Sequence, residues 1–155
     1  MIIRTDEKLK LEVKKIFIDK WKTDYMISKY KIHYVDNLES FVYLENNTIV
    51  GLLTFVIENN EIEIVSLDSF KENNGIGSLL INEIIKYYKI NNFKKVWLVT
   101  TNDNLHALKF YQKRNFNISN IYLNAVNKAR EIKPSIPKNG YDDIPILHEI
   151  ELTYL

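Results

Sequence analysis

Two glycines, Gly75 and Gly77, stand where a predicted strand gives way to a predicted helix. Residues 61–67 alternate in the period-2 manner of a strand, and the apolar residues from Ile76 onward recur at helical spacing. The first turn of a helix carries backbone N–H groups without partners inside the helix, the macrodipole adds partial positive charge, and glycine lets a bulky anion approach. The sequence therefore predicts a phosphate or pyrophosphate site made largely of backbone from 73 to 78. The alternative is an ordinary strand-to-helix turn in which the glycines serve geometry alone.

The spacing of this loop distinguishes three kinds of phosphate site. A phosphate loop of the Gly-x4-Gly-Lys-Ser/Thr type is absent, and the dinucleotide fingerprint fails because Leu80 stands where its third glycine is required. The segment from Glu72 to Gly77 instead resembles the Gln/Arg-x-x-Gly-x-Gly/Ala loop with which the GNAT superfamily of N-acetyltransferases grips the pyrophosphate of coenzyme A. The first position departs from that pattern, because the Glu72 carboxylate cannot donate to phosphate. Either the backbone would then do more of the binding, or Lys71 would help.

A second segment resembles the same family. Its other coenzyme A motif is Asn-x-x-Ala-x-x-x-Tyr-x-x-x-Gly-Phe, and here the motif reads Asn104, Ala107, Tyr111, Asn115 and Phe116. Only the glycine is changed, to an asparagine that tolerates the same left-handed backbone. Two motifs at the right separation, each in the right local structure, indicate the family far more specifically than either one alone.

The resemblance implies a fold and a cosubstrate. The expected architecture is the α/β GNAT fold, a central twisted mixed sheet flanked by helices, with acetyl-CoA in the cleft opened by the fourth and fifth strands. The positions that match the family motifs and are expected to bind acetyl-CoA are Leu67, Asp68, Ser69, Glu72, Asn73, Asn74, Gly75, Ile76, Gly77, Ser78, Asn104, Ala107 and Tyr111. Asn104 would hydrogen-bond the pantetheine arm, and capping of the following helix is an equally good interpretation of it.

The implied reaction is direct attack of a primary amine on acetyl-CoA, and this reaction requires three catalytic groups. An oxyanion donor is implied among backbone N–H groups near 67–69, by the bulge of the fourth strand. The leaving thiolate needs a proton or a hydrogen bond, and Tyr111 holds the family's position for this role. The alternative for Tyr111 is a core tyrosine with a satisfied hydroxyl. Because the nucleophile is a neutral amine, a base must also take a proton.

Glu63 and Glu61 are the candidate bases. Alternation places both side chains on one face of their strand. By spacing, Glu61 aligns with the general base of the histone-acetylating branch of the family. Glu63 lies deeper in the sheet, where partial burial would make it a stronger base. The alternative for each is a solvated strand carboxylate. Further alternatives are His33, His106 and His148, and the wide separation of these histidines indicates no metal site.

The elements that would position these residues follow from local patterns. Strands are predicted over 1–4, 41–45, 48–57, 61–67, 95–100, 118–123 and 146–154. Helices are predicted from a cap at Thr5 or Asp6 to about 21, from 76 to about 90, from a cap at Asn102 or Asp103 to about 114, and from 124 to 132. Asparagine pairs at 46–47 and 59–60 predict tight hairpin turns. The aromatic segment 21–34 is predicted to be irregular, either walling the acceptor pocket, as the resemblance implies, or packing over one end of the sheet.

Composition fits one globular domain spanning 1–155. A net charge of +1 gives no large basic footprint for nucleic acid, and no apolar run approaches the length of a membrane span. The lack of cysteine excludes zinc thiolate sites and a cysteine nucleophile, and it fits a cytoplasmic protein. The resemblance implies an amine as the acceptor, and a small-molecule amine and a protein amine both stay open.

Two other functions stay open at this point. Glu72 in the pyrophosphate loop motivates a non-catalytic acyl-CoA sensor or regulatory module that keeps the GNAT fold. An interaction protein that forms a homodimer through its last strand is the other alternative. The segment 129–137 also resembles a branch of uncharacterised bacterial GNAT proteins.

Overall fold

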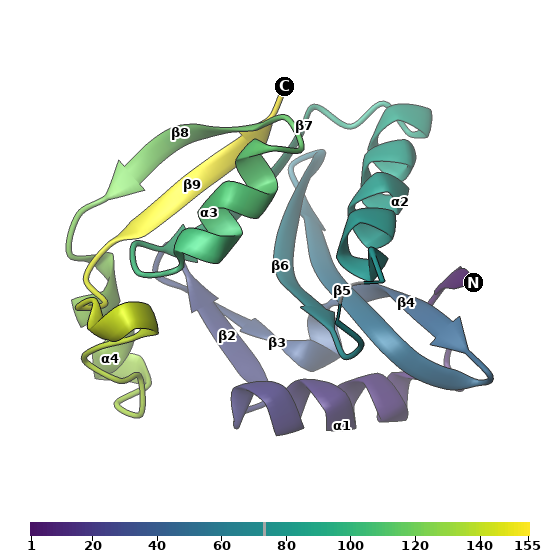
Figure 1. Cartoon of the computed structure of the whole chain (residues 1–155), viewed down its shortest axis with the longest axis horizontal. Coiled ribbons are helices and arrows are strands. Elements are labelled where there is room, and N and C mark those ends of the chain that lie inside the picture. Colours follow the sequence, from purple (N-terminus) through teal and green to yellow (C-terminus); the bar gives the residue numbers. More distant parts are fainter. Residues whose placement is uncertain (73) are drawn as a thin grey trace. The chain divides into compact units, whose positions relative to one another are not determined.

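The computed structural model describes residues 1–72 and 74–155. Their helices and strands are drawn in sequence colours in Figure 1. The chain forms two compact units, the first made of Met1–Met26 and His33–Val96 and the second of Ile27–Ile32 and Trp97–Leu155. The glycine loop therefore belongs to the first unit, and the second motif belongs to the second.

The first unit is built on four antiparallel strands. In the order β1-β4-β5-β6, they are β1 Ile2–Arg4, β4 Glu39–Glu45, β5 Thr48–Glu58 and β6 Glu61–Ser69. Two asparagines form each tight turn between β4 and β5 and between β5 and β6, and Asn46, Asn47, Asn59 and Asn60 have φ values of 50°, 63°, 55° and 61°. Because asparagine tolerates this left-handed conformation, both predicted hairpins form.

Helix α1, Lys10–Trp21, begins after a polar turn. The Asp6 carboxylate accepts hydrogen bonds from the backbone N–H groups of Lys8 and Leu9, each at 3.1 Å. The predicted cap at Thr5 or Asp6 is nevertheless wrong, because the N-cap residue is Leu9, no side chain caps the helix, and Asp6 stabilises only the turn before it. The buried side chain of Val13 packs in one hydrophobic cluster with residues of β4 and β5.

Helix α2, Ile76–Ile90, follows β6 and covers the opposite face of these strands. Its buried residues are those that the helical spacing predicted: Ile76, Leu80, Ile81, Ile84 and Ile85. The ring of Tyr87 lies 6.0 Å from the rings of both Phe41 and Phe55, whereas the neighbouring Val42 packs with α1. Successive strand residues point to opposite faces, so the two helices cover the two sides of β4 and β5.

The second unit is built on three antiparallel strands in the order β7-β9-β8. They are β7 Lys95–Thr101, whose first two residues belong to the first unit, β8 Phe116–Tyr122 and β9 Glu149–Tyr154. Helix α3, Leu105–Gln112, follows β7, and helix α4, Ala125–Ile132, follows β8. Short 3-10 turns span Val35–Asn37 in the first unit and Tyr141–Asp143 in the second.

The segment 21–34 differs from its prediction, because most of it is regular. Strands β2, Tyr25–Ser28, and β3, Lys31–Tyr34, form a two-stranded hairpin. Its turn residues Lys29 and Tyr30 have φ values of 47° and 65°. Two-residue turns of this kind favour Asn and Gly, so a Lys-Tyr pair carries no turn signal in the sequence.

Strand β9 begins later than the predicted strand over 146–154. The side chain of Asn102 explains the difference: its Oδ1 accepts the backbone N–H groups of Leu147 and His148, each at 2.9 Å, and its Nδ2 donates to the carbonyl of Pro145 at 2.9 Å. These bonds hold the approach to β9 as a loop, so strand pairing starts only at Glu149.

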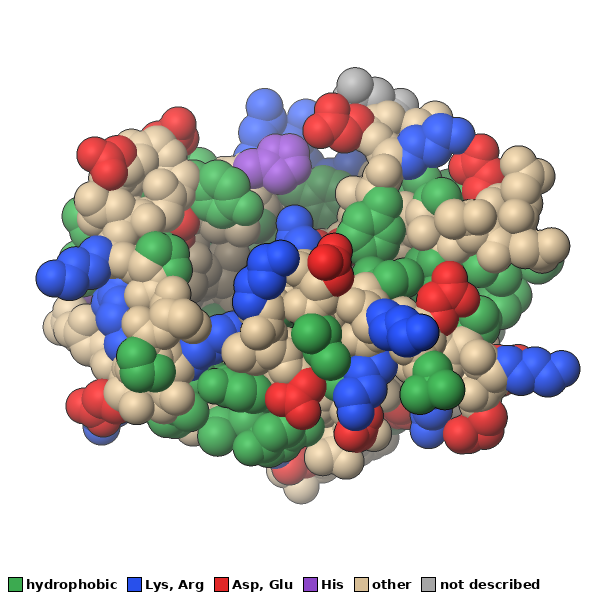
Figure 2. All heavy atoms as spheres, turned by 90° about the horizontal axis from the view of Figure 1, so that it is seen from below, with side chains coloured by type: hydrophobic (Ala, Val, Ile, Leu, Met, Phe, Trp, Pro, Cys, Tyr) green, Lys and Arg blue, Asp and Glu red, His purple; other side chains and the backbone are tan. Residues whose placement is uncertain are grey.

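No helix in the described part of the chain combines the length and apolar character that crossing a membrane requires. Figure 2 shows one face of the molecule, on which lysine, arginine, aspartate and glutamate side chains are interspersed. No single sign of charge dominates the face seen in that view, in line with the net charge of +1.

Candidate functional site

The residues predicted to bind acetyl-CoA divide between the two units. The first unit holds Leu67, Asp68, Ser69, Glu72, Asn74, Gly75, Ile76, Gly77 and Ser78, and the second holds Asn104, Ala107 and Tyr111. The candidate bases Glu61 and Glu63 lie on β6 of the first unit. Asn73 belongs to the same motif and lies outside the described residues.

The loop between β6 and α2 closes with a glycine in the left-handed region. Gly75 has φ 68° and ψ 14°, and it is the N-cap residue of α2. A Cβ placed on Gly75 would meet no atom within 4 Å. The backbone conformation therefore calls for glycine, while the space beside it is open. Because the cap is glycine, no cap side chain covers the start of α2, where Ile76, Gly77 and Ser78 form the first turn. Such a helix start can take an anion.

The charged residues of this loop are exposed. Lys71 Nζ lies 2.7 Å from Glu45 Oε1 at the end of β4, and Glu72 extends into solvent. The Ser69 hydroxyl donates to the Lys71 carbonyl at 3.0 Å, and the Asn74 amide donates to the Glu72 carbonyl at 2.8 Å. An exposed ion pair contributes only about 0–1 kcal/mol, so Lys71 can leave Glu45 for a phosphate at small cost.

The end of β6 carries a partly buried carboxylate. Burial raises the pKa of Asp68 above its ordinary value, and the charge of Lys20 and a hydrogen bond from Trp21 oppose this shift in part. Lys20 Nζ and Asp68 Oδ1 are 4.0 Å apart. Leu67, Asp68 and Ser69 pair with the middle of β5. The predicted oxyanion donors are thus backbone groups of an ordered antiparallel ladder.

Strand β6 contains a bulge ahead of 67–69, where the sequence analysis expected it. Thr54 of β5 pairs with Ser66 and Phe55 pairs with Ile64, which leaves Val65 as an extra residue in β6. Beside the bulge, the hydroxyls of Thr54 and Ser66 hydrogen-bond at 2.6 Å, and both side chains are buried. Because of the extra residue, side chains beyond the bulge point to the opposite face of the sheet from the one that regular alternation predicts. The predicted period-2 alternation therefore does not hold along the whole of 61–67.

Glu63 is buried beside a histidine that is distant in sequence. Only 7% of Glu63 and 4% of His33 are exposed, and His33 Nε2 lies 3.4 Å from Glu63 Oε1. The interpretation of Glu63 as a solvated strand carboxylate is therefore wrong. The structure joins two residues that the sequence analysis named as alternatives, and it supplies a carboxylate–imidazole pair that can hold or move a proton.

The other candidate bases have different surroundings. Glu61 is half-buried and pairs with Glu58 at the β5–β6 turn. His106 is exposed on α3. His148 precedes β9, and its Nδ1 accepts the backbone N–H of Asn124 at 2.9 Å, which engages this nitrogen in holding a loop.

Helix α3 places the second motif in the core of the second unit. The Asn104 side chain accepts the N–H of Ala107 at 3.1 Å, so Asn104 is the helix cap. Tyr111 is buried, and its ring packs edge-on against Phe110 at 5.1 Å and Phe116 at 5.4 Å. The ring of Tyr111 is therefore a core element, whichever role its hydroxyl has.

The predicted caps Asn102 and Asp103 are wrong, because both side chains have other partners. Asn102 holds the loop before β9, as described above. Asp103 is buried; its Oδ1 accepts the Thr101 hydroxyl at 2.5 Å, and its Oδ2 accepts the Tyr141 N–H at 3.2 Å. Asn115 has φ 67°, which confirms that it can replace the motif glycine.

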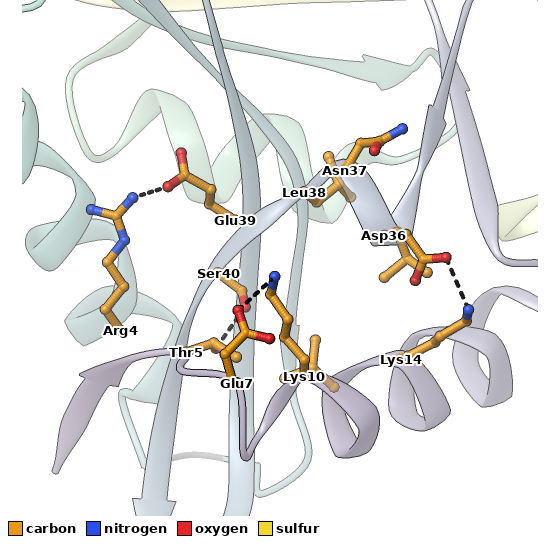
Figure 3. A pocket seen from close by; sticks show the side chains of 12 residues that line it. Arg4, Thr5, Glu7, Lys10, Lys14, Asp36, Asn37, Leu38, Glu39 and Ser40 are labelled. Atoms are coloured by element: carbon orange, nitrogen blue, oxygen red, sulfur yellow. Dashed lines mark hydrogen bonds and ion pairs between the residues drawn. The ribbon is translucent and has the colours of Figure 1, made fainter.

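A pocket of about 610 Å³ in the first unit is separate from the predicted residues (Figure 3). Its described lining comes from 4–14 and 35–40, and it includes none of the predicted site residues. The charged groups drawn there are paired: Arg4 with Glu39, Lys10 with Glu7 and Lys14 with Asp36. Within 1–72 and 74–155, no cluster of three or more His, Cys, Asp or Glu side chains could hold a metal ion.

Known proteins share both the sequence pattern and the fold. The model of the acetyltransferase (GNAT) family matches residues 7–116. The uncharacterised protein YxbD of Bacillus subtilis (strain 168) is 40% identical over 152 residues, which is 97% of this chain and 96% of that protein. A solved GNAT family acetyltransferase from Elizabethkingia anophelis with acetyl-CoA bound has a TM-score of 0.71 at 23% identity, covering 99% of this chain and 96% of its own. The IAA acetyltransferase from Bacillus cereus ATCC 14579 has a TM-score of 0.71 at 19% identity, covering 99% and 97%.

These similarities confirm the predicted α/β GNAT fold and the likeness to uncharacterised bacterial proteins. They extend over both motif regions, since the family match runs from residue 7, just before α1, to the end of the second motif at Phe116. The chain belongs to the GNAT family of acetyltransferases.

Proposed function

We propose that this protein transfers the acetyl group of acetyl-CoA to a primary amine by direct attack. The observation that carries the proposal is the glycine-capped start of α2, where Gly75 has φ 68° and open space beside it, within a chain that belongs to the GNAT family. A helix N-terminus of this form suits a pyrophosphate, and pyrophosphate binding is what the family loop does. A relative in fold has acetyl-CoA bound.

The reaction would proceed through a tetrahedral intermediate. The amine nitrogen attacks the thioester carbonyl, the C–N bond forms, and the oxyanion accepts a backbone N–H from 67–69. Collapse breaks the C–S bond, and the Tyr111 hydroxyl gives the leaving thiolate a proton. The proton lost by the amine goes to a base.

Glu63 is the base that the surroundings favour. Its carboxylate is buried and lies beside His33, with 3.4 Å between Oε1 and Nε2, whereas Glu61 sits beside an exposed turn. In this scheme Glu63 takes the proton from the amine, directly or through water, and His33 positions the carboxylate. His33 is thus a positioning residue.

The test is calorimetric titration with acetyl-CoA, followed by measurement of thiol release with an amine library. Wild-type protein should bind acetyl-CoA, and Gly77→Glu should not, because it adds bulk and negative charge to the first turn of α2. Tyr111→Phe should keep binding and lose turnover. Unchanged turnover of Tyr111→Phe would remove Tyr111 from the mechanism, and binding that survives Gly77→Glu would place the pyrophosphate elsewhere.

A non-catalytic acyl-CoA sensor is the second candidate. It is favoured by Glu72, an acidic residue at the position where the family motif has a phosphate donor. A sensor would bind acetyl-CoA and release no thiol with any amine. The lack of cysteine fits a reducing cytoplasm for either function.

A further inference from the structure

An ammonium group is held in a cage of aromatic and acidic side chains in the second unit. Lys29 Nζ lies 4.5 Å from the ring centre of Trp97, 5.2 Å from the ring centre of Tyr122 and 3.0 Å from Glu151 Oε1. Both rings are within the distance at which a cation is attracted to an aromatic face. We call Trp97, Tyr122 and Glu151 the ammonium cage.

The cage carboxylate is fixed by its own hydrogen bonds. Glu151 is only 4% exposed, and it accepts the Tyr122 hydroxyl at Oε1 (2.9 Å) and the Ser119 hydroxyl at Oε2 (3.0 Å). Ser119 in turn hydrogen-bonds the hydroxyl of Thr153 at 2.8 Å. A carboxylate buried this far is costly unless a cation and donors accompany it. The cage is therefore built to hold a positive charge.

The occupant of the cage comes from the tip of the β2–β3 hairpin. Lys29 is a turn residue with φ 47°, next to Tyr30 with φ 65°, a conformation that L-residues other than Asn and Asp adopt at a cost. Its backbone N–H donates to Glu149 Oε2 at 3.0 Å, and Glu149 is 3% exposed. The Lys29 side chain keeps 34% of its surface exposed, so solvent reaches the cage along it.

The surroundings of Lys29 favour the charged form. Burial alone would lower the pKa of Lys29, but hydrogen bonds with Tyr122 and Glu151 and the charge of Glu151 outweigh it, so the pKa is raised. The cage thus selects an ammonium over a neutral amine, and an external alkylammonium offers the same group.

We propose that the ammonium cage is the binding site for a cationic end of the acceptor, that Lys29 competes for it, and that the acceptor is a diamine or longer polyamine. The first two parts stand on the geometry of the cage, and the last part rests on the proposed acetyl transfer. An ammonium held by Glu151 has no free electron pair and cannot attack a thioester. The acceptor must therefore carry a second amine, which is neutral when it attacks. The C–N bond forms at that second nitrogen, the thioester C–S bond breaks, and the proton passes to the base.

The binding arm of the test needs no acetyl-CoA. Calorimetry with n-pentylamine measures the cage alone, with 1-pentanol as the uncharged control. Lys29→Met keeps an unbranched apolar stem and removes the competing charge, so n-pentylamine should bind about tenfold more tightly than to wild type. Glu151→Gln should weaken binding in both backgrounds. Lys31→Met, at an exposed lysine two residues along the same hairpin, should bind like wild type. Equal affinity of Lys29→Met and wild type would overturn the competition, and binding that ignores Glu151→Gln would overturn the cage.

A measurement on wild-type protein covers the case in which a variant does not fold. Reductive methylation with formaldehyde in excess over all amines labels lysines according to their exposure, and labelling of Lys29 relative to the exposed Lys31 in the same sample should rise several-fold when 1,5-diaminopentane displaces Lys29. Labelling unaffected by the diamine would reject the displacement.

The turnover arm compares 1,5-diaminopentane with n-pentylamine at equal concentration. The diamine should be acetylated and the monoamine should not, and equal rates would overturn the diamine assignment. If n-pentylamine binds the cage and nothing is acetylated, the proposed transferase function fails while the ammonium site stands.

Discussion

Gly51 lies on β5 beneath the first turn of α2, and the structure predicts that Gly51→Ala destabilises the first unit. A Cβ at this position would collide with Cγ2 of Ile76 and stand 3.1 Å from Cδ1 of Leu80 and 3.4 Å from Cβ of Tyr43. Ile76 and Leu80 are buried, so neither can swing into solvent to make room. The start of α2 must move away from the sheet instead.

Overpacking of a well-packed core costs about 1–3 kcal/mol. For a chain of this length, 1 kcal/mol corresponds to about 2–4 °C in melting temperature, so we expect the melting temperature of Gly51→Ala to fall on the order of 5 °C. Because the moved turn is the proposed pyrophosphate site, the affinity for acetyl-CoA should fall with it. Differential scanning calorimetry and titration measure the two effects.

A double-mutant cycle with Ile76→Ala separates this collision from other causes. Ile76→Ala alone leaves a cavity and costs about 2–5 kcal/mol, but it also removes the methyl group that the new Cβ would strike. The double variant should therefore be more stable than the sum of the two single effects predicts. Strict additivity, or a melting temperature of Gly51→Ala at or above that of wild type, would refute the account of close packing at Gly51.

Five further substitutions at four positions test the site. Gly75→Ala should cost about 1 kcal/mol because of φ 68°, while Gly75→Asn should cost less, and thermal melts compare the two. Asn104→Ala should cost about 1 kcal/mol through loss of the helix cap, seen as a lower urea midpoint with unchanged slope. The pKa of Asp68 is raised by folding, so the neutral carboxyl stabilises the fold at pH values below the unfolded pKa of 3.8, and this stability is lost as pH rises through the folded pKa. The melting temperature of Asp68→Asn should therefore exceed that of wild type at pH 7. The difference between the two melting temperatures should close at pH 3. Glu63→Gln should lower kcat about a hundredfold or more at unchanged acetyl-CoA affinity, and an unaltered kcat would exclude it as the base.

Local chemistry made much of the first unit predictable. The hairpins at 46–47 and 59–60 were predicted because asparagine pairs mark turns with positive φ, and both form. The buried face of α2 followed from helical spacing alone. The Lys29-Tyr30 turn has the same backbone without the same residues, and therefore its hairpin could not be predicted.

Contacts between distant segments account for what the sequence did not reveal at the candidate site. His33 and Glu63 are 30 positions apart on different strands, and only the folded chain brings their side chains to 3.4 Å. The cap of α3 was misplaced for a related reason. Asn102 and Asp103 have good capping chemistry, but loop residues beyond 140 engage both of them and leave the cap to Asn104.

The asparagine turns also bear on the unfolded chain. Seven described asparagines have positive φ: Asn46, Asn47, Asn59, Asn60, Asn92, Asn115 and Asn124. Glycine would reach the same conformations with less strain, but it would give the unfolded state more backbone freedom to lose, worth up to about 1 kcal/mol at each position. By using asparagine, the chain limits the number of conformations that compete with folding at these bends.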